Sequence, residues 1–463
     1  MSEGLNSSAI LRLENLLDED SFVELGSLIT ARVTDFNLNP KEAPSDGVVT
    51  GYGLIDGRLV FVYSQDSSVL NGTIGEMHAK KILNVYDKAM KMGAPVIGLI
   101  DCGGVRLQEA FDATEAIGEI IAKACEASGS VPQITGIFGN CGGGLSVLPA
   151  LSDFAFMTND AKLFVNSPDA ISGNYTEKND TSSADFQFAA GNVDDIGNEE
   201  EVLNKIRQMV AVLPSSSMDG AFADECLDDL NRGAVGLEEK RDEVAAIASE
   251  LSDGNVFVET KTGYAKDMVT GFAILNGQTI GVVGNQAIED GEVLTAKGAQ
   301  KAASFVKFCD AYEIPVLSLT NVNAYKACEC AEMNLPKALA LLSVAFASAS
   351  VPKINLITKK AGGSAYLFMN GKSLGADLTY AFPDVDMSIM DANLAGGILA
   401  GENGDVSKAA AEFEETQTGL SNAARRGIVD RVVNFADARK YLIAGFDMLF
   451  EKSDSVYKKH SAK

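Results

Sequence analysis

Positive charge is scarce in this 463-residue chain, which has 38 Lys and Arg residues against 64 Asp and Glu residues. The net charge of -26 repels phosphate backbones and anionic membrane surfaces, so we expect no nucleic-acid partner. A small phosphate-bearing ligand would need a local cluster of cations. The first half of the chain offers Lys80, Lys81, Lys91 and Arg106 for such a cluster, although single lysines on a helix usually form its solvated face.

Histidine is scarcer still, with only His78 and His460 in the sequence. This leaves little material for a Ser-His-Asp arrangement or a histidine-built metal site, and we predict no bound metal. Ser146 follows three glycines but lacks the spacing of a nucleophile elbow, so a small serine that packs in a helix is the preferred interpretation. Glu109 is an acid/base candidate, but its place three residues after Arg106 favours a salt bridge.

Disulfide pairs and long apolar runs are also missing. The seven cysteines contain no CxxC pair, and the start "MSEGLNSSAI" lacks the regions of a secretory signal, so we expect a reducing, cytoplasmic location. The longest apolar stretch, "ALALLSVAFASAS" (338–350), lies between "LPK" and "VPK" and is too short to cross a bilayer. We expect it to form a buried helix.

The chain repeats itself at an offset of 220 residues. The segment "VVTGYGLIDGRLVFVYSQD" (48–66) recurs as "MVTGFAILNGQTIGVVGNQ" (268–286). In the same register, Pro95 matches Pro315, and Gly142-Gly143 matches Gly362-Gly363. A constant register over so long a span predicts two copies of one fold.

Each copy shows the same order of patterns. A hairpin leads to a helix, a buried strand rich in Val, Ile and Leu, another helix, another strand and a glycine-rich turn that opens a helix. Such alternation is typical of an α/β fold with a mainly parallel sheet, in which ligands lie beyond the carboxyl ends of the strands. We predict two domains, 1–235 and 236–463, with the acidic segment 236–255 as a linker helix and turn.

Glycine turns follow the buried strands of the first copy in "IDCGGVRLQEA" (100–110) and "FGNCGGGLSVLPALSDF" (138–154). Glycines leave backbone N–H groups uncovered, and a helix that begins there adds its unpaired amides. Such a turn can hold a phosphate or the oxyanion of a thioester enolate. The simpler alternative is that the glycines only permit tight turns. Their recurrence in "KKAGGSAYLFMN" (359–370) favours two oxyanion sites, one in each copy.

The segment "DKAMKMGAP" (87–95) contains the tetrapeptide that biotin ligases recognise, centred on Lys91. A biotinylated lysine stands at the tip of a β-hairpin, whereas Lys91 ends a stretch with helical spacing in which Gly93 resembles a C-cap. We therefore predict a helix terminus without biotin, with Met90 and Met92 packed in the core.

Several blocks of the sequence, taken in order, resemble the carboxyltransferase subunits of biotin-dependent acyl-CoA carboxylases and decarboxylases, such as the propionyl-CoA carboxylase β and methylmalonyl-CoA decarboxylase α subunits. The resemblance covers most of the chain. The blocks are "RLENLLDEDSFVELG", "SDGVVTGYGLIDGR", "VYSQDSSVLNGTIGEMHAKKI", "GGVRLQEA", "CGGGLSVLPALSDFAFM", "FVKFCDAYEIPVL" and "MNGKSLGADLTYAFP".

This resemblance implies two tandem crotonase-like domains, with acyl-CoA bound by 1–235 and biotin by 236–463. It implies a homo-hexamer, a trimer of dimers, in which the first half of one subunit faces the second half of another. It also implies that biotin arrives on a separate biotin carboxyl carrier protein, and that biotin carboxylase or membrane decarboxylase subunits are further partners.

The same resemblance assigns roles to individual residues. Amides at one set of positions would hold the thioester oxygen of acyl-CoA: Gly143, Gly144, Gly104 and Val105. Amides at a second set would hold the ureido oxygen of biotin: Gly363, Ser364 and Ala365. Three neighbouring glycines would complete these binding turns: Gly103, Gly142 and Gly362.

Two segments depart from the family pattern. The segment "NVNAYKACECAEMN" (321–334) replaces a Val-Pro-Gly-Phe run on the biotin side, and "SADFQFAAGNVDDIG" (183–197) replaces a Gly-Gly-Ala and His pattern near the acyl group. Two alternatives therefore stay open: a crotonase-like acyl-CoA hydrolase, isomerase or decarboxylase that works without biotin, and a non-catalytic subunit of a hetero-oligomer. The sequence does not identify the acyl group or the direction of the reaction.

Overall fold

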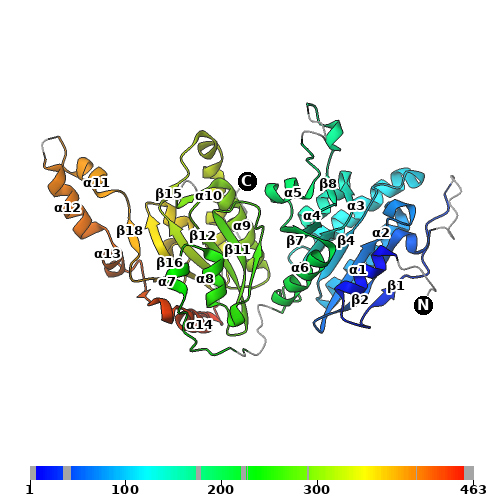
Figure 1. Cartoon of the computed structure of the whole chain (residues 1–463), viewed down its shortest axis with the longest axis horizontal. Coiled ribbons are helices and arrows are strands. Elements are labelled where there is room, and N and C mark those ends of the chain that lie inside the picture. The colour runs from blue at the N-terminus through cyan, green and yellow to red at the C-terminus, as the bar shows by residue number, and fades with distance from the viewer. Residues whose placement is uncertain are drawn as a thin grey trace. The chain divides into compact units, whose positions relative to one another are not determined.

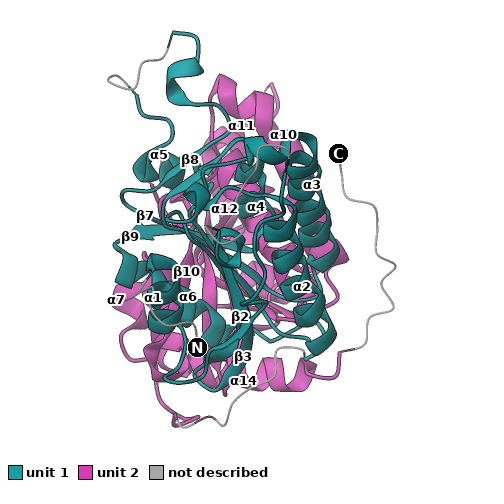
Figure 2. Cartoon of the chain, turned by 90° about the vertical axis from the view of Figure 1, so that its right-hand side faces the viewer, with its two compact units in different colours: residues 1–220 teal, residues 221–463 magenta. Residues whose placement is uncertain are grey.

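The computed structural model describes residues 7–34, 43–173, 179–219, 226, 228–288, 291–402 and 404–452. The chain forms two compact units, Met1–Gly220 and Ala221–Lys463, which Figure 2 colours separately.

The first unit is built on a seven-stranded sheet with the order β1-β2-β3-β4-β5-β7-β9 (Figure 1). The hairpin strands β1 to β3 pair antiparallel, and every pair from β3 to β9 is parallel. The strands are β1 (Val23–Leu25), β2 (Val48–Ile55), β3 (Arg58–Gln65), β4 (Val96–Ile100), β5 (Gln133–Ile137), β7 (Phe154–Thr158) and β9 (Asp195–Gly197). A separate short pair, β6 (Asn140–Gly142) and β8 (Lys162–Phe164), forms beyond the end of β5.

The helices of the first unit bury one apolar face against the strands or against each other. The longest pair, α2 and α3, pack on each other and contribute Ile82, Val85 and Ile120 to the core. The helices are α1 (Ser8–Leu16), α2 (Glu76–Met92), α3 (Ala110–Ala127), α4 (Val147–Leu151), α5 (Ala184–Ala190) and α6 (Glu199–Val212).

The second unit repeats this plan with the sheet order β10-β11-β12-β14-β16-β17-β19, and β18 pairs with β16. The strands are β10 (Phe257–Thr260), β11 (Met268–Leu275), β12 (Gln278–Asn285), β14 (Val316–Val322), β16 (Lys353–Gly362), β17 (Leu378–Ala381), β18 (Asp386–Ser388) and β19 (Arg431–Val432). A short parallel pair joins β13 (Val293–Leu294) to β15 (Ala324–Tyr325).

The helices of the second unit include a group that extends away from its sheet, α11 to α13 (Figure 1). They are α7 (Leu237–Lys240), α8 (Val244–Leu251), α9 (Ala296–Ala311), α10 (Glu329–Ser348), α11 (Ala392–Leu399), α12 (Val406–Gln417), α13 (Leu420–Arg425) and α14 (Ala438–Leu449).

The internal repeat predicted from the sequence is confirmed. The hairpin strands β2 and β3 have the same bounds as β11 and β12 after a shift of 220 residues, and the two sheets follow the same order. Because both copies place their parallel strands alike, the turns after equivalent strands lie at equivalent edges.

Two sequence-based expectations were wrong in part. The segment 236–255 is helical, but it is not a linker, because Leu237, Ile247 and Leu251 lie in the core of the second unit. The apolar stretch 338–350 is helical as far as Ser348, as expected, but it is not buried on all sides. Helix α10 runs through Pro336, and only one of its faces is buried.

Helix α10 is also the one helix, among the described residues, whose length and composition would suffice to cross a membrane. Glu329 and Glu332 lie in its first turn, and α10 packs against α9 within the second unit. These contacts are those of a helix that belongs to the fold.

The segment around Lys91 is helical, as predicted. Helix α2 ends at Met92, and Gly93 adopts the left-handed conformation of a C-cap with a φ of 62°. Met90 packs against the core, but Met92 does not, since 63% of its surface is exposed. The expectation that both methionines are buried was therefore half wrong.

Candidate functional site

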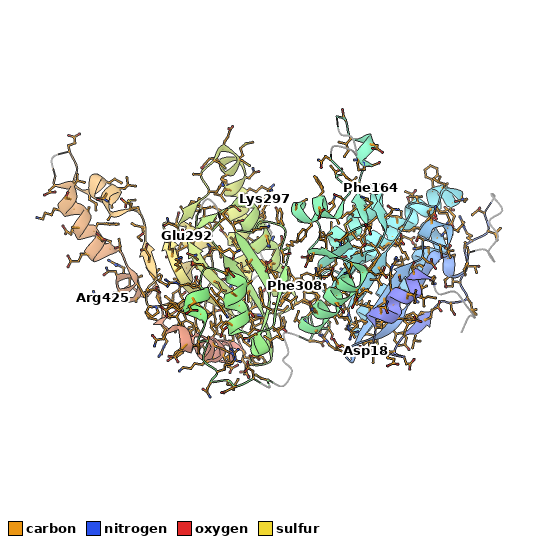
Figure 3. The ribbon with its side chains drawn as sticks, viewed as in Figure 1. Asp18, Phe164, Glu292, Lys297, Phe308 and Arg425 are labelled. Atoms are coloured by element: carbon orange, nitrogen blue, oxygen red, sulfur yellow. The ribbon has the colours of Figure 1, made fainter. Side chains whose placement is uncertain are left out.

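A pocket of about 410 Å³ opens beyond the carboxyl ends of β4 and β5 in the first unit. We call it the first pocket. Its lining residues are Cys102, Gly103, Gly104, Val105, Ile117, Asn140, Gly142, Gly143, Gly144 and Phe164. Phe164, labelled in Figure 3, comes from β8. The sequence-predicted glycines of the first half are thus brought together in one cavity.

The glycines of this pocket do two different things. A Cβ on Gly142 would meet the ring of Phe164 at 2.6 Å, so a side chain here would force that ring to move. A Cβ on Gly143 would meet nothing within 4 Å, and one on Gly144 would only touch Ile117 at 3.9 Å. Gly143 and Gly144 therefore leave their main chain open to the pocket.

The amides of this turn are available to a ligand. The 3-10 helix η5 (Gly143–Ser146) begins at Gly143, and the first N–H groups of a helix have no acceptor inside it. The side chain of Ser146 donates to the carbonyl of Gly143 at 2.7 Å, which holds the turn closed. Ser146 therefore has a structural role here, in agreement with its interpretation as a packing residue.

The loop after β4 supplies one further open amide. Gly103 N–H donates to Asn71 O at 2.8 Å, and Gly104 N–H donates to Cys102 Sγ at 3.2 Å. Val105 and Ile74 form an isolated parallel β-bridge. Its two hydrogen bonds run from Ile74 N–H to Gly104 O and from Arg106 N–H to Ile74 O, so the N–H of Val105 takes no part in the bridge. Of the three predicted positions in this loop, Val105 is thus the best placed donor.

The first pocket offers main-chain chemistry and no charged side chain. Neither a carboxylate nor an imidazole belongs to its lining. Burial raises the pKa of the Cys102 thiol to about 11, so the thiol is protonated at neutral pH and is a poor nucleophile. The arrangement can stabilise negative charge on a bound oxygen, whereas covalent catalysis has no suitable group.

Arg106 lies behind the pocket in a buried ion cluster. Its guanidinium donates to Glu109 at 3.0 Å and pairs with Asp46, while its Nη2 donates to Thr73 O at 2.6 Å. Arg106, Asp46 and Glu109 all have exposures of 4% or less. The favoured salt bridge between Arg106 and Glu109 is confirmed.

The four cations considered as candidates for a phosphate site do not act together, because two of them are buried. Arg106 is occupied by the cluster just described, and the ammonium group of Lys81 donates to Ser45 O at 3.1 Å and to Val48 O. Burial lowers the pKa of Lys81 to about 8. Neither side chain faces solvent, so neither is free to meet a phosphate.

His78 is a structural residue. Its ring hydrogen on Nδ1 donates to Asp46 O at 2.9 Å, and its Nε2 accepts from Gln65 Nε2 at 3.1 Å. Burial lowers the pKa of His78 to about 3, so the ring is neutral. The second histidine, His460, lies outside the described residues.

The second unit has an equivalent turn at the end of β16. A Cβ on Gly362 would meet Asn323 O at 2.2 Å, so Gly362 is required for packing. Gly363 N–H donates to Ser388 O at 2.8 Å, which uses the first of the three predicted donors. The 3-10 helix η8 (Ala365–Phe368) follows, and the amides of Ser364 and Ala365 lie at its start. The donors at this turn are therefore two and not three.

The segment 321–334, which departs from the family pattern, is ordered around this turn. Asn323 N–H donates to Glu292 O at 2.7 Å, and Tyr325 belongs to β15. Tyr325 Oη lies 2.9 Å from Ser364 Oγ, within hydrogen-bonding distance. Sequence reasoning did not anticipate this pair, because nothing local links residues so far apart in the chain.

A family model decides what kind of protein this is. The carboxyl transferase domain matches residues 5–462. The chain belongs to the carboxyl transferase family.

Curated relatives cover nearly the same length as this carboxyl transferase. The propionyl-CoA carboxylase beta chain of Roseobacter denitrificans is 38% identical, over 97% of this chain and 92% of its own. The methylmalonyl-CoA decarboxylase subunit alpha of Propionigenium modestum is 35% identical, over 97% and 91%.

Solved structures agree with this family. Transcarboxylase 12S, described as a hexamer with methylmalonyl-coenzyme A and methylmalonic acid bound, matches with a TM-score of 0.91 and 31% identity over 98% of this chain and 92% of its own. A single-chain, multi-domain long-chain acyl-CoA carboxylase matches with a TM-score of 0.79 at 22% identity, over 94% of this chain and 45% of its own, and supports the fold alone. The expected fold of the carboxyl transferase, two tandem crotonase-like α/β domains, is confirmed.

Proposed function

We propose that this protein moves a carboxyl group between a small acyl-CoA and biotin held on a separate carrier protein. The observation that carries the proposal is the first pocket, which presents main-chain amides and no nucleophilic or acid/base side chain. That chemistry suits a reaction in which a thioester becomes an enolate, since the negative charge appears on an oxygen that amides can stabilise.

In this proposal the first pocket binds the thioester. The amides of Gly143 and Gly144, with help from Val105 across the pocket, face the thioester oxygen. Ile117 and Phe164 provide the apolar walls for the acyl group. The main chain at Gly104 is open to the pocket, since the residue has no side chain and even a Cβ there would meet nothing within 4 Å.

The turn at the end of β16 is proposed to bind the urea group of biotin, which supplies the nitrogen that accepts or gives up the carboxyl group. Ser364 and Ala365 would donate their amides to the ureido oxygen, while Gly362 and Gly363 fix the turn through Asn323 and Ser388. This also assigns acyl-CoA to the first half and biotin to the second half.

A separate biotin carboxyl carrier is part of the proposal because Lys91, the one lysine in a biotin-ligase-like tetrapeptide, lies in the last turn of helix α2. We also propose a hexamer, by likeness to transcarboxylase 12S, and partner subunits of the carboxylase or decarboxylase kind. A cytoplasmic location fits the seven cysteines, all of which are free thiols.

The test uses the purified full chain with methylmalonyl-CoA or malonyl-CoA and either free biotin or a biotinylated carrier domain. We expect loss of the acyl-CoA carboxyl group that depends on biotin. Decarboxylation that is equally fast without biotin would support a biotin-independent acyl-CoA enzyme instead. Absence of any reaction with small acyl-CoA substrates would support a non-catalytic subunit.

A further inference from the structure

The two glycine turns carry different side chains at equivalent positions. In the first unit Ile74 pairs with Val105, and in the second unit Leu294 pairs with Tyr325 in the same parallel sense, exactly one repeat later in sequence. The turns are also aligned, with Gly142 paired to Phe164 and Gly362 paired to Ser388.

This alignment places Tyr325 where the first unit has Val105, and Ser364 where it has Gly144. Val105 and Gly144 both line the first pocket. The second unit therefore has two hydroxyl groups where the first unit has an apolar side chain and a bare backbone.

The hydroxyl pair is held in place by the fold. Tyr325 is fixed in β15, and Lys326 N–H donates to Leu294 O at 3.1 Å directly after it. The ring of Tyr325 contacts Phe368, with ring centroids 6.2 Å apart. Ser364 is exposed, and Tyr325 is half-buried, so the pair reaches solvent at the turn.

When two hydroxyl groups share one hydrogen bond, one of their two hydrogens remains free to be donated elsewhere. The two groups carry two hydrogens, and the bond of 2.9 Å between Tyr325 Oη and Ser364 Oγ uses one of them. The other can be donated to a third acceptor. Because the pair reaches solvent, this hydrogen is available to an oxygen of a bound ligand.

We propose that the Tyr325–Ser364 hydroxyl pair donates a hydrogen bond to the carbonyl oxygen of the urea group of biotin, beside the amides of Ser364 and Ala365. This inference rests on the proposed function and deepens it, because it gives the altered segment 321–334 a role in recognising biotin. The pair adds a side-chain donor where the first unit relies on its main chain.

The experiment measures binding, so that it does not depend on turnover. Binding of free biotin and of 2-iminobiotin, in which a nitrogen replaces the urea oxygen, is titrated by ligand-observed NMR against the full chain. Wild type should prefer biotin. The double variant Tyr325→Phe/Ser364→Ala removes both hydroxyls and keeps the ring and the main-chain amide. It should reduce the preference about tenfold, whereas either hydroxyl alone would still carry a hydrogen to donate.

Tyr441→Phe is the matched control. Tyr441 of α14 is half-buried, and its Oη accepts from Arg431 Nη2 at 2.7 Å, so its hydroxyl pairs with a residue outside the turn. This variant should retain the wild-type preference, and unchanged thermal unfolding of the double variant and of Tyr441→Phe shows that the fold survives.

The outcomes separate this inference from the proposed function. If the double variant prefers biotin as strongly as wild type does, the hydroxyl pair has no role and the biotin site itself remains supported. If wild type shows no preference for biotin over 2-iminobiotin, both the hydroxyl pair and the proposed urea site are wrong.

Discussion

The two halves of this chain use one backbone plan for two kinds of surface. In the first half, the turn after β6 faces Ile117 and Phe164, and its open positions are glycines. In the second half, the equivalent turn carries the hydroxyls of Tyr325 and Ser364. The comparison teaches that duplication preserved the strands and the turn, while the side chains around the turn changed.

The halves also differ in what supports the turn. Arg106 anchors the first loop through a buried cluster with Asp46 and Glu109. One repeat later the chain has Lys326, which is half-buried. The first loop is therefore held by buried charge and the second mainly by the short pair of β13 and β15.

Removal of Arg106 should give the largest loss of stability. Arg106→Ala leaves the buried carboxylates of Asp46 and Glu109 without their cationic partner, and we expect a loss of about 3–5 kcal/mol in the free energy of unfolding. Lys326→Ala should cost about 1 kcal/mol or less, because exposed and half-buried ion contacts contribute little. Urea denaturation of both variants measures the difference. Equal losses would show that the two loops are supported alike.

Blocking the first pocket should abolish most of the activity. Gly144→Val places its side chain toward Ile117, and Gly143→Val adds backbone strain at a φ of +63°. We expect carboxyl transfer to fall on the order of a hundredfold to a thousandfold, the range for loss of an oxyanion donor.

The control for these variants is Gly118→Val on the exposed face of α3, where a Cβ would meet nothing within 4 Å. Its transfer rate should equal that of wild type. Persistent activity in a folded Gly144→Val protein would mean that the first pocket is not the acyl-CoA site.

Substitution of Gly362 should cost more stability than substitution of Gly142, its equivalent in the first half. A methyl on Gly362 meets the backbone oxygen of Asn323 at 2.2 Å, whereas one on Gly142 meets the ring of Phe164, which can turn aside. Gly362→Ala should therefore cost about 1–3 kcal/mol of stability, the range for overpacking, and Gly142→Ala less. Thermal unfolding of the two variants tests the order. A larger loss for Gly142→Ala would show that Phe164 is rigid.

The buried His78 should make the free energy of unfolding depend on pH. The second unit has no equivalent group, because the residue 220 positions after His78 is Gly298. Its folded-state pKa of about 3 lies below the usual 6.5. Between these values the unfolded chain binds the extra proton, so stability falls as pH falls from 6.5 toward 3.

The slope from this one group is at most about 1.4 kcal/mol per pH unit. His78→Gln should reduce the pH dependence of the free energy of unfolding between pH 6.5 and 5, relative to wild type. An unchanged slope would contradict a neutral, buried imidazole.

Periodicity and the internal repeat were enough to predict the hairpins, the parallel strands and the turns, because each depends on residues that are close in sequence. The predicted gathering of Gly104, Val105 and Gly143 in one pocket is found, since turns after neighbouring parallel strands meet at one edge. The functional roles of these residues stay predictions.

What the sequence did not reveal depends on distant contacts. Asp46 reaches Arg106 across 60 positions, and Tyr325 reaches Ser364 across 39. The many acidic residues of 236–255 favoured a solvent-exposed linker, although Leu237 and Ile247 are buried in the core of the second unit.

The most direct measurement is a crystal structure of the protein with methylmalonyl-CoA bound. The account predicts that the thioester oxygen lies about 3 Å from the amide nitrogen of Gly144, inside the first pocket. A thioester bound instead at the turn of Ser364 and Ala365, or away from both turns, would contradict it.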